Sequence, residues 1–389
     1  MKSLTILLKI YRQIRWLILI GLIFLLLNLS IRHWMTPQFL YQDDFVAYWS
    51  AGHLLILGGN PYNSSELLRV EREKAWRPWE EALMLWNPPW TLVLLLPFGF
   101  LPYSAARVLW FFLQIVTVAW SAHILWALYG GPFRKSLIAW LLAFSYVPTL
   151  VMIRYGQSAM WILLGLSGFL YFAQRRRWTA AGVALSLTTI KPQVIYLILV
   201  AAGLWMIRNR NWRFGFGWIS PIVLATALVA LINPAILYAY LQTMREESPA
   251  RLATFTLGAW LRLSLGIESE IVQFFPVLLG LAGTLWYHHY HLQWNWSRQL
   301  PRLTMFSLIT MPYGWLYDYT VALIAILPSV LTIPKQPSRT FRWAAYGCYI
   351  FLNIMPVFSV HQFQYAWIGV VQWIWYEWVS RMTGQRYVQ

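Results

Sequence analysis

The chain has 389 residues, of which 59% are hydrophobic and 11% charged, and its formal net charge is +17. A soluble globular domain carries about 25% charged residues, so this composition excludes an ordinary soluble protein. The basic residues form short clusters between apolar runs, a pattern that indicates membrane topology and excludes a nucleic-acid-binding surface. A single cysteine, Cys348, excludes a disulfide framework and a cysteine-based metal site within one chain.

The first 31 residues combine a basic lead with an apolar run, residues 17–31. No small-residue cleavage site follows this run, so we expect a retained membrane anchor with a cytoplasmic N-terminus. Residues 32–87 then form an acidic loop, which we predict on the outer side. The loop is expected to contain an amphipathic helix in the interface plane, with one side made by Phe45, Tyr48, Trp49, Leu55 and Ile56.

Residues 88–129 contain a short and a long apolar run, although only one net crossing fits between the outer loop and a cytoplasmic Arg134. Pro97 and Pro102 interrupt the short run, so we expect residues 88–102 to be re-entrant or to form a half helix. The alternative is that Arg134 and Lys135 lie outside and that a later segment is the half helix.

The rest of the chain alternates apolar runs with basic clusters to a cytoplasmic C-terminus. Runs of this length predict helices that span a membrane, such as residues 137–153 and 214–232. We therefore expect one all-α, multi-pass domain over residues 1–389, with about twelve transmembrane helices. The expected outer segments are residues 154–158, 191–192, 233–270, 312–319 and 359–364.

Two adjacent acids, Asp43 and Asp44, lie in the outer loop shortly after the first apolar run. A carboxylate at the outer interface can act as a general base if a hydroxyl group reaches it. The alternative is a solvated loop end. Their side chains should point to different sides in a helix or in a strand.

Other polar groups interrupt apolar sequence on the predicted outer side. Lys191 lies in an apolar stretch, where it is either a loop residue or a cation held for an anionic group such as a lipid phosphate. Arg154 runs against the orientation bias of basic residues. Asp318, beside Tyr317, is a carboxylate in a hydrophobic region. The cluster of His288, His289 and His291 falls on the cytoplasmic side, and we interpret it as an interfacial loop rather than a metal site.

An ordered set of motifs resembles a known family. It comprises Asp-Phe-Val-Ala-Tyr-Trp-Ser-Ala-Gly at 44–52, Gly-Gly-Asn-Pro-Tyr at 58–62, Trp-Asn-Pro-Pro at 86–89, Leu-Pro at 96–97 and 101–102, Tyr-Gly-Gln at 155–157, Ala-Gly at 181–182, Ile-Lys-Pro at 190–192, Pro-Tyr at 312–313 and Tyr-Asp at 317–318. The set resembles glycosyltransferase family 87, the polyprenol-phosphate-mannose-dependent mannosyltransferases and relatives of the GT-C superfamily.

This resemblance implies an inverting membrane glycosyltransferase with a GT-C-like helical bundle. It would transfer a sugar, mannose in the first instance, from a polyprenyl-phosphate carrier to a lipid or glycan acceptor at the outer face of a bacterial cell membrane. Asp44 matches the position of the general base, and no cofactor or metal is expected. The expected substrate-binding residues are Lys191, Arg154, Gln157, Asp318, Tyr317 and Asp43. Some family members carry a histidine where this chain has Tyr317-Asp318, a difference that bears on the identity of the sugar.

A transporter or flippase of lipid-linked sugars is the alternative function. Such a protein is expected to show inverted repeats and broken helices near the middle of the membrane. The sequence contains no recognisable repeat, and its polar residues gather toward one face instead. Sugar transfer in detergent separates the two functions, because transport needs two compartments.

Overall fold

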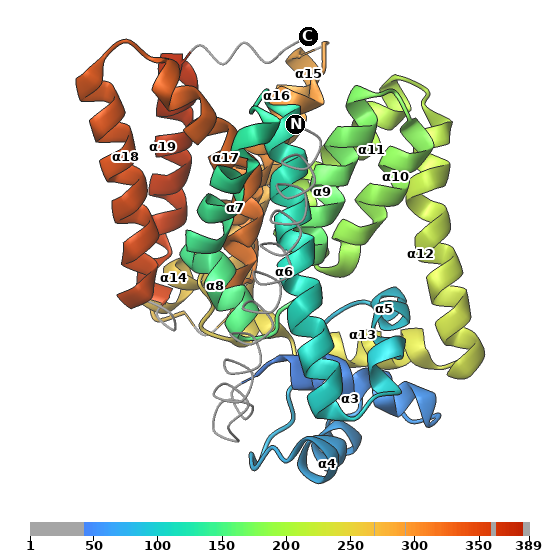
Figure 1. Cartoon of the computed structure of the whole chain (residues 1–389). Helices are drawn as coiled ribbons and strands as arrows, with labels where there is room; N and C mark the ends of the chain where they lie inside the picture. Colours follow the sequence, from blue (N-terminus) through green and yellow to red (C-terminus); the bar gives the residue numbers. More distant parts are fainter. Residues whose placement is uncertain (1–42, 268, 292, 359–362, 384–389) are drawn as a thin grey trace, which may run out of the picture.

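The protein is described by a computed structural model for residues 43–267, 269–291, 293–358 and 363–383, and the regular elements in these ranges are all helical. Figure 1 shows a bundle of long helices, with the short helices α3, α4, α5 and α13 gathered at its lower end. Helices satisfy their own backbone groups, as lipid requires. The predicted all-α class is therefore confirmed, whereas the predicted anchor at residues 17–31 lies outside the described residues.

The elements follow one another as α-helices and short 3-10 helices (η). The first half contains α3 (Phe45–Ile56), α4 (Ser64–Ala75), η1 (Pro89–Thr91), α5 (Leu92–Gly99), α6 (Tyr103–Leu128), η2 (Phe133–Lys135), α7 (Ser136–Ser145), α8 (Val147–Arg154), α9 (Ala159–Gln174), α10 (Trp178–Ser186), η3 (Leu187–Ile190), η4 (Pro192–Val194) and α11 (Tyr196–Arg208). The second half contains α12 (Trp212–Ile232), α13 (Ile236–Glu246), η5 (Pro249–Arg251), α14 (Leu257–Ser264), η6 (Glu270–Phe274), α15 (Phe275–Tyr290), α16 (Trp296–Thr310), η7 (Leu316–Ala322), α17 (Leu323–Thr332), η8 (Ile333–Lys335), α18 (Arg339–Ile354), η9 (Met355–Phe358), η10 (Phe363–Tyr365) and α19 (Trp367–Thr383).

Four helical stretches in the described ranges are long and apolar enough to cross a membrane: Tyr103–Leu128, Trp212–Ile232, Glu270–Tyr290 and Leu316–Lys335. The pair Phe133–Ser145 and Val147–Arg154, bent by 66°, gives a fifth if it is counted as one broken span. Helix α12, Trp212–Ile232, is the most exposed of the four, because only 17% of its apolar 18-residue stretch is buried inside the protein. The rest of that surface suits contact with lipid, because water-soluble proteins rarely expose large apolar patches.

The apolar runs of the sequence are more broken than the prediction of about twelve crossings assumed. Residues 137–153 divide into α7 and α8, and residues 179–207 divide into α10, η3, η4 and α11 around Lys191. Each piece alone is shorter than the about 20 residues that a straight crossing needs. The crossing number of about twelve and the outer position of residues 32–87 therefore stay predictions.

The segment with the uncertain crossing is short in the structure. The apolar helical stretch Pro89–Gly99 spans about 16 Å at 1.5 Å per residue, which is less than the about 30 Å of a bilayer core. This short length agrees with the prediction of a re-entrant segment or a half helix. The stretch packs closely on α3, because a Cβ added at Gly99 would lie 2.5 Å from the carbonyl carbon of Gly52. Glycine at this contact lets the two backbones approach.

Helix α3 forms where an amphipathic interfacial helix was predicted, but its surroundings differ from the prediction. Ten of its 12 residues are buried, including Phe45, Tyr48 and Trp49. The helix contacts α4, α5 and α6, which cover its sides. It is therefore a buried element at the end of the bundle, and the expected division into one apolar and one polar face is wrong.

Candidate active site

The two adjacent acids at the start of α3 point to different sides, as the sequence predicts. Asp43 is fully buried, accepts a hydrogen bond from the backbone N–H of Phe45 (2.9 Å) and forms an ion pair with Arg107 of α6. Asp44 instead accepts a hydrogen bond from the side-chain amide of Gln157 (2.7 Å) and lines a cavity. Of these two acids, only Asp44 is therefore placed where it can contact a substrate.

The turn after α8 fixes the position of Gln157. Gly156 has a φ of +64°, and a Cβ there would lie 2.5 Å from a carboxylate oxygen of Asp43, so the turn favours glycine in both conformation and space. The indole N–H of Trp110 donates to the Gly156 carbonyl (2.8 Å), and the amide of Gln114 donates to the Gln157 carbonyl (3.0 Å). Helix α6 thus holds this turn against the start of α3.

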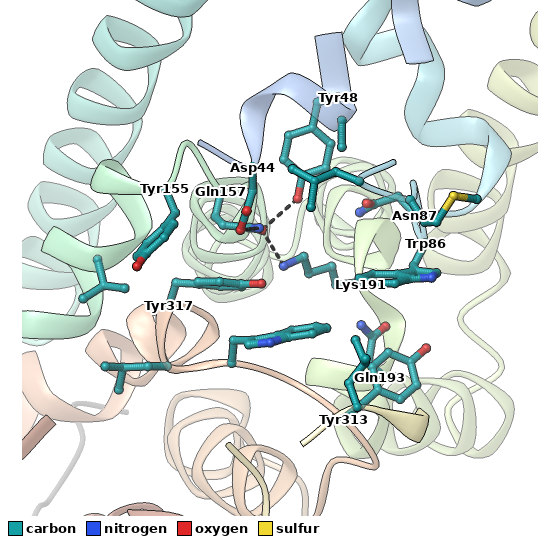
Figure 2. A pocket seen from close by; sticks show the side chains of 17 residues that line it. Asp44, Tyr48, Trp86, Asn87, Tyr155, Gln157, Lys191, Gln193, Tyr313 and Tyr317 are labelled. Carbon is teal, nitrogen blue, oxygen red and sulfur yellow. Dashed lines mark hydrogen bonds between the residues drawn. The ribbon is translucent and has the colours of Figure 1, made fainter. Parts of the chain in front are cut away.

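The side chain of Gln157 connects the polar groups of the site (Figure 2). Its Nε2 donates to Asp44, and its Oε1 accepts from the Tyr48 hydroxyl (2.8 Å) and from the Lys191 ammonium (2.8 Å). These partners set the amide's orientation, because the carboxylate needs its N–H side and the two donors need its oxygen. The neutral amide keeps the carboxylate and the ammonium close without joining them as an ion pair.

Lys191 lies in the break between η3 and η4, so the predicted interruption at this residue is confirmed. Its side chain is 8% exposed and donates to a carboxylate oxygen of Asp318 (2.8 Å). The ring of Tyr317 lies beside it, with 4.7 Å between the ammonium nitrogen and the ring centre. The two hydrogen bonds leave one of the three ammonium N–H groups without a hydrogen-bond partner in the described part of the chain.

Asp318 lies behind Lys191 at the start of the span Leu316–Lys335, and its side chain is fully buried. One carboxylate oxygen accepts from Lys191, while the other accepts from the backbone N–H of Trp315 (3.0 Å). The residue does not line the cavity. Its position suits it to orient and charge-balance Lys191 rather than to touch a substrate.

These groups surround a cavity of about 300 Å³, which we call the reaction cavity. Aromatic rings form part of its wall, because Trp86 stacks on Trp315 (5.9 Å between ring centres) and Trp315 stacks on Tyr317 (5.8 Å). The lining residues are Asp44, Ala47, Tyr48, Leu83, Met84, Trp86, Asn87, Val151, Tyr155, Gln157, Lys191, Gln193, Leu252, Tyr313, Trp315, Leu316 and Tyr317. Segments from five of the predicted outer regions therefore meet here, namely residues 32–87, 154–158, 191–192, 233–270 and 312–319.

Burial sets the chemistry of Asp44, which lies just before α3 and outside the helices long enough to cross a membrane. Removal from water raises the pKa of its carboxyl group to about 6, although the hydrogen bond from Gln157 and the charge of Lys191 partly oppose the shift. The group is then mostly ionised near neutral pH, yet more basic than an ordinary aspartate. A general base works best when its pKa is close to the working pH.

Besides Asp318, two predicted site residues do not line the reaction cavity. Asp43 is sealed behind Asp44, and Arg154 stacks over Tyr155 (5.9 Å from its guanidinium carbon to the ring centre) without lining the cavity. Among the described residues, no group of three or more histidines, cysteines or acids is placed to hold a metal ion.

Several lining residues were not predicted as site residues. Tyr48 lies four residues after Asp44, a spacing that puts both on one side of a helix and could have identified it. Asn87 donates to the Ile190 carbonyl (3.0 Å) and so supports the break at Lys191. Asn87 belongs to the Trp-Asn-Pro-Pro motif, but nothing in the local sequence indicates this role. The lining position of Gln193 had no separate signal in the sequence.

Comparisons with known proteins bear on this site. A model of glycosyltransferase family 87 matches residues 85–359, well over half of the chain. The match includes Gln157, Lys191 and Asp318 but begins after Asp44. No curated protein and no solved structure matches the chain. The described part of the chain contains four helical stretches that are long and apolar enough to cross a membrane, and the family match settles the class of reaction: the chain belongs to glycosyltransferase family 87 and is a membrane glycosyltransferase.

Proposed function

We propose that the protein transfers a sugar, mannose in the first instance, from a polyprenyl-phosphate carrier to a hydroxyl group of a lipid or glycan acceptor, with inversion at the anomeric carbon. The observation that carries the proposal is the pairing of a carboxylate and an ammonium in one cavity. Asp44 and Lys191 both line the reaction cavity and are bridged by Gln157.

Asp44 is the general base of this proposal. Its carboxylate takes the proton of the acceptor hydroxyl while the acceptor oxygen forms a bond to the anomeric carbon of the donor. The raised pKa, about 6, supports this role because proton transfer becomes more favourable as the base becomes stronger. The neutral contact to Gln157 also supports it, because a direct ion pair with Lys191 would make the carboxylate less basic.

Lys191 is the cation that receives the leaving group. As the bond between the anomeric carbon and the phosphate oxygen breaks, negative charge grows on the polyprenyl phosphate. An ammonium held by Gln157 and Asp318 needs little rearrangement to stabilise that charge, and a fixed charge is most effective in a site that excludes water. Its remaining N–H group can donate to a phosphate oxygen.

The orientation of the bundle supports an outer position for the reaction cavity. In Figure 1, α3, α5 and α13 lie at the lower end, whereas the basic connections from α9 to α10 and from α11 to α12 lie at the upper end. Basic loops favour the cytoplasmic side. With Cys348 replaced, a membrane-impermeant thiol reagent should label Ser64→Cys from outside and spare Ser136→Cys, and labelling of Ser136→Cys alone would reverse the assigned orientation.

The function is tested with purified protein in detergent and a short-chain polyprenyl-phosphate mannose. We expect mannose transfer to a glycan acceptor, with an anomeric configuration in the product opposite to that of the donor by NMR. A nucleotide-activated mannose serves as the control donor, and we expect the enzyme to transfer no mannose from it. Transfer from the nucleotide donor alone would overturn the proposed carrier, and retained configuration would overturn the single-displacement mechanism.

A further inference from the structure

A second cavity, of about 680 Å³, adjoins the reaction cavity. The two cavities share four wall residues, Leu83, Met84, Trp86 and Leu252. A ligand in the second cavity would therefore reach the reaction cavity past Trp86. We call the second cavity the acidic groove and define it by Arg77, Trp79, Glu80, Glu81, Glu246 and Glu247.

The acidic groove is held in shape by contacts between two distant segments. The indole N–H of Trp86 donates to the Glu247 carbonyl (2.9 Å), which joins the loop before η1 to the end of α13. Arg77, only 8% exposed, pairs with the carboxylate of Glu71 (2.6 Å) and donates to the Glu81 carbonyl (2.6 Å). These contacts form a preorganised wall on one side of the groove.

The charged side chains that line the groove indicate which class of ligand it can bind. Four glutamates line it against two arginines, Arg77 and Arg251, and both arginines pair with other acids, Glu71 and Glu270. In a chain of net charge +17 this region is locally acidic. It should repel an anionic ligand, while its carboxylates can accept hydrogen bonds from neutral hydroxyl groups. Trp79, 49% exposed, and Trp86 add aromatic surface for the apolar face of a sugar ring.

We propose that the acidic groove binds the acceptor, and that this acceptor is a neutral oligosaccharide rather than a phosphorylated or otherwise anionic glycan. This inference rests on the proposed function, because it assumes that a hydroxyl group must reach Asp44. The reactive end of the acceptor passes Trp86 into the reaction cavity, and the preceding sugar units lie along Trp79 and the glutamates.

Binding is measured without catalysis, by saturation-transfer NMR on purified protein in a sugar-free detergent. The probes are methyl mannobioside and the same disaccharide carrying a 6-phosphate. We expect the neutral probe to bind at least tenfold more tightly than the phosphorylated one, with a smaller difference at high salt because salt screens exposed charges. Equal binding, or tighter binding of the phosphorylated probe, would overturn the charge argument.

Variants locate the binding. Trp79→Ala should weaken binding of the neutral probe about tenfold, and Glu80→Gln combined with Glu246→Gln should narrow the difference between the probes. Trp343→Ala replaces another exposed tryptophan, on α18 and away from both cavities, and is the matched control. If Trp79→Ala binds the neutral probe as well as Trp343→Ala does, the groove is not the acceptor site.

The same assay separates this inference from the proposed function. Asp44→Asn should bind the neutral probe normally while losing transfer, because Asp44 does not line the acidic groove. Probe binding that depends on Trp79 in a protein with no transferase activity toward polyprenyl-phosphate donors would keep the groove and reject the proposed donor. Transfer to the neutral acceptor that is insensitive to Trp79→Ala would keep the donor and reject the groove.

Discussion

Two buried ion pairs lie beside the turn that contains Gly156 and Gln157, and they differ in whether one of their members lines the reaction cavity. Arg107 and Asp43 are enclosed by α3, α6 and the turn after α8, and neither lines the reaction cavity. Lys191 and Asp318 are as deeply buried, but the ammonium lines the reaction cavity. The comparison teaches that burial and pairing alone do not mark a functional charge. The open face toward a cavity distinguishes the pair that can take part in chemistry.

The largest effect is expected at the carboxylate that faces the cavity. Asp44→Asn keeps the shape and removes the basicity, so the transfer rate should fall about 10²–10⁴-fold, the range typical for loss of a general base. Donor binding and thermal stability should stay close to those of the wild type. Transfer kinetics with purified variant and wild type give the measurement, and a rate within threefold of the wild type would remove Asp44 from this role.

The enclosed pair should respond in stability. Asp43→Asn leaves the Arg107 guanidinium buried without its counter-charge, a change that costs about 3–5 kcal/mol in comparable pairs. We expect a clearly lower melting temperature, with transfer by the remaining folded protein reduced far less than in Asp44→Asn. Thermal melts in detergent, with the transfer rate normalised to folded protein, check this contrast. Normal stability with lost transfer would assign Asp43 a role in the reaction.

The cavity-facing pair should respond in donor use. Replacing Lys191 alone leaves Asp318 charged and buried, so the sharper variant removes both charges as Lys191→Met with Asp318→Asn. Removal of a whole pair is often nearly neutral for stability, whereas loss of the contact to a charged ligand costs about 2–5 kcal/mol. The double variant should fold and lose at least about 30-fold in kcat/KM for the donor, while Lys191→Arg keeps part of it. Unchanged donor kinetics would exclude Lys191 as the phosphate partner.

Local sequence signals were enough for part of this picture. Apolar runs predicted an all-helical membrane protein, and a lysine inside such a run predicted the break at Lys191. The opposite directions of Asp43 and Asp44 follow from backbone geometry alone. Each of these features depends on residues that are close in the sequence.

Contacts between distant segments were not predictable in the same way. Lys191 and Asp318 are 127 residues apart, and Asp43 and Arg107 are 64 apart, so neither pairing is visible in a local pattern. Gln157 is neutral, and a neutral amide in a turn gives little sign that it will bridge two charges. The number of crossings was also beyond local reasoning, because bends and 3-10 segments divide runs that look continuous.

The smallest effect concerns the pH dependence of the reaction. Because burial raises the pKa of Asp44 to about 6, the carboxylate becomes protonated as pH falls through that value. A protonated base cannot accept the acceptor's proton, so kcat/KM should be level above about pH 7 and fall about tenfold per pH unit well below 6.

The hydrogen bond from Gln157 lowers the pKa of Asp44, so Gln157→Leu should move the midpoint of the pH profile to higher pH. The midpoint is the informative quantity, since losing the bridge to Lys191 will also reduce the rate. The midpoint is measured from kcat/KM for the acceptor as a function of pH, with saturating donor, for the wild type and for Gln157→Leu. A midpoint that stays in place or moves to lower pH in Gln157→Leu would mean that a group other than Asp44 controls the reaction.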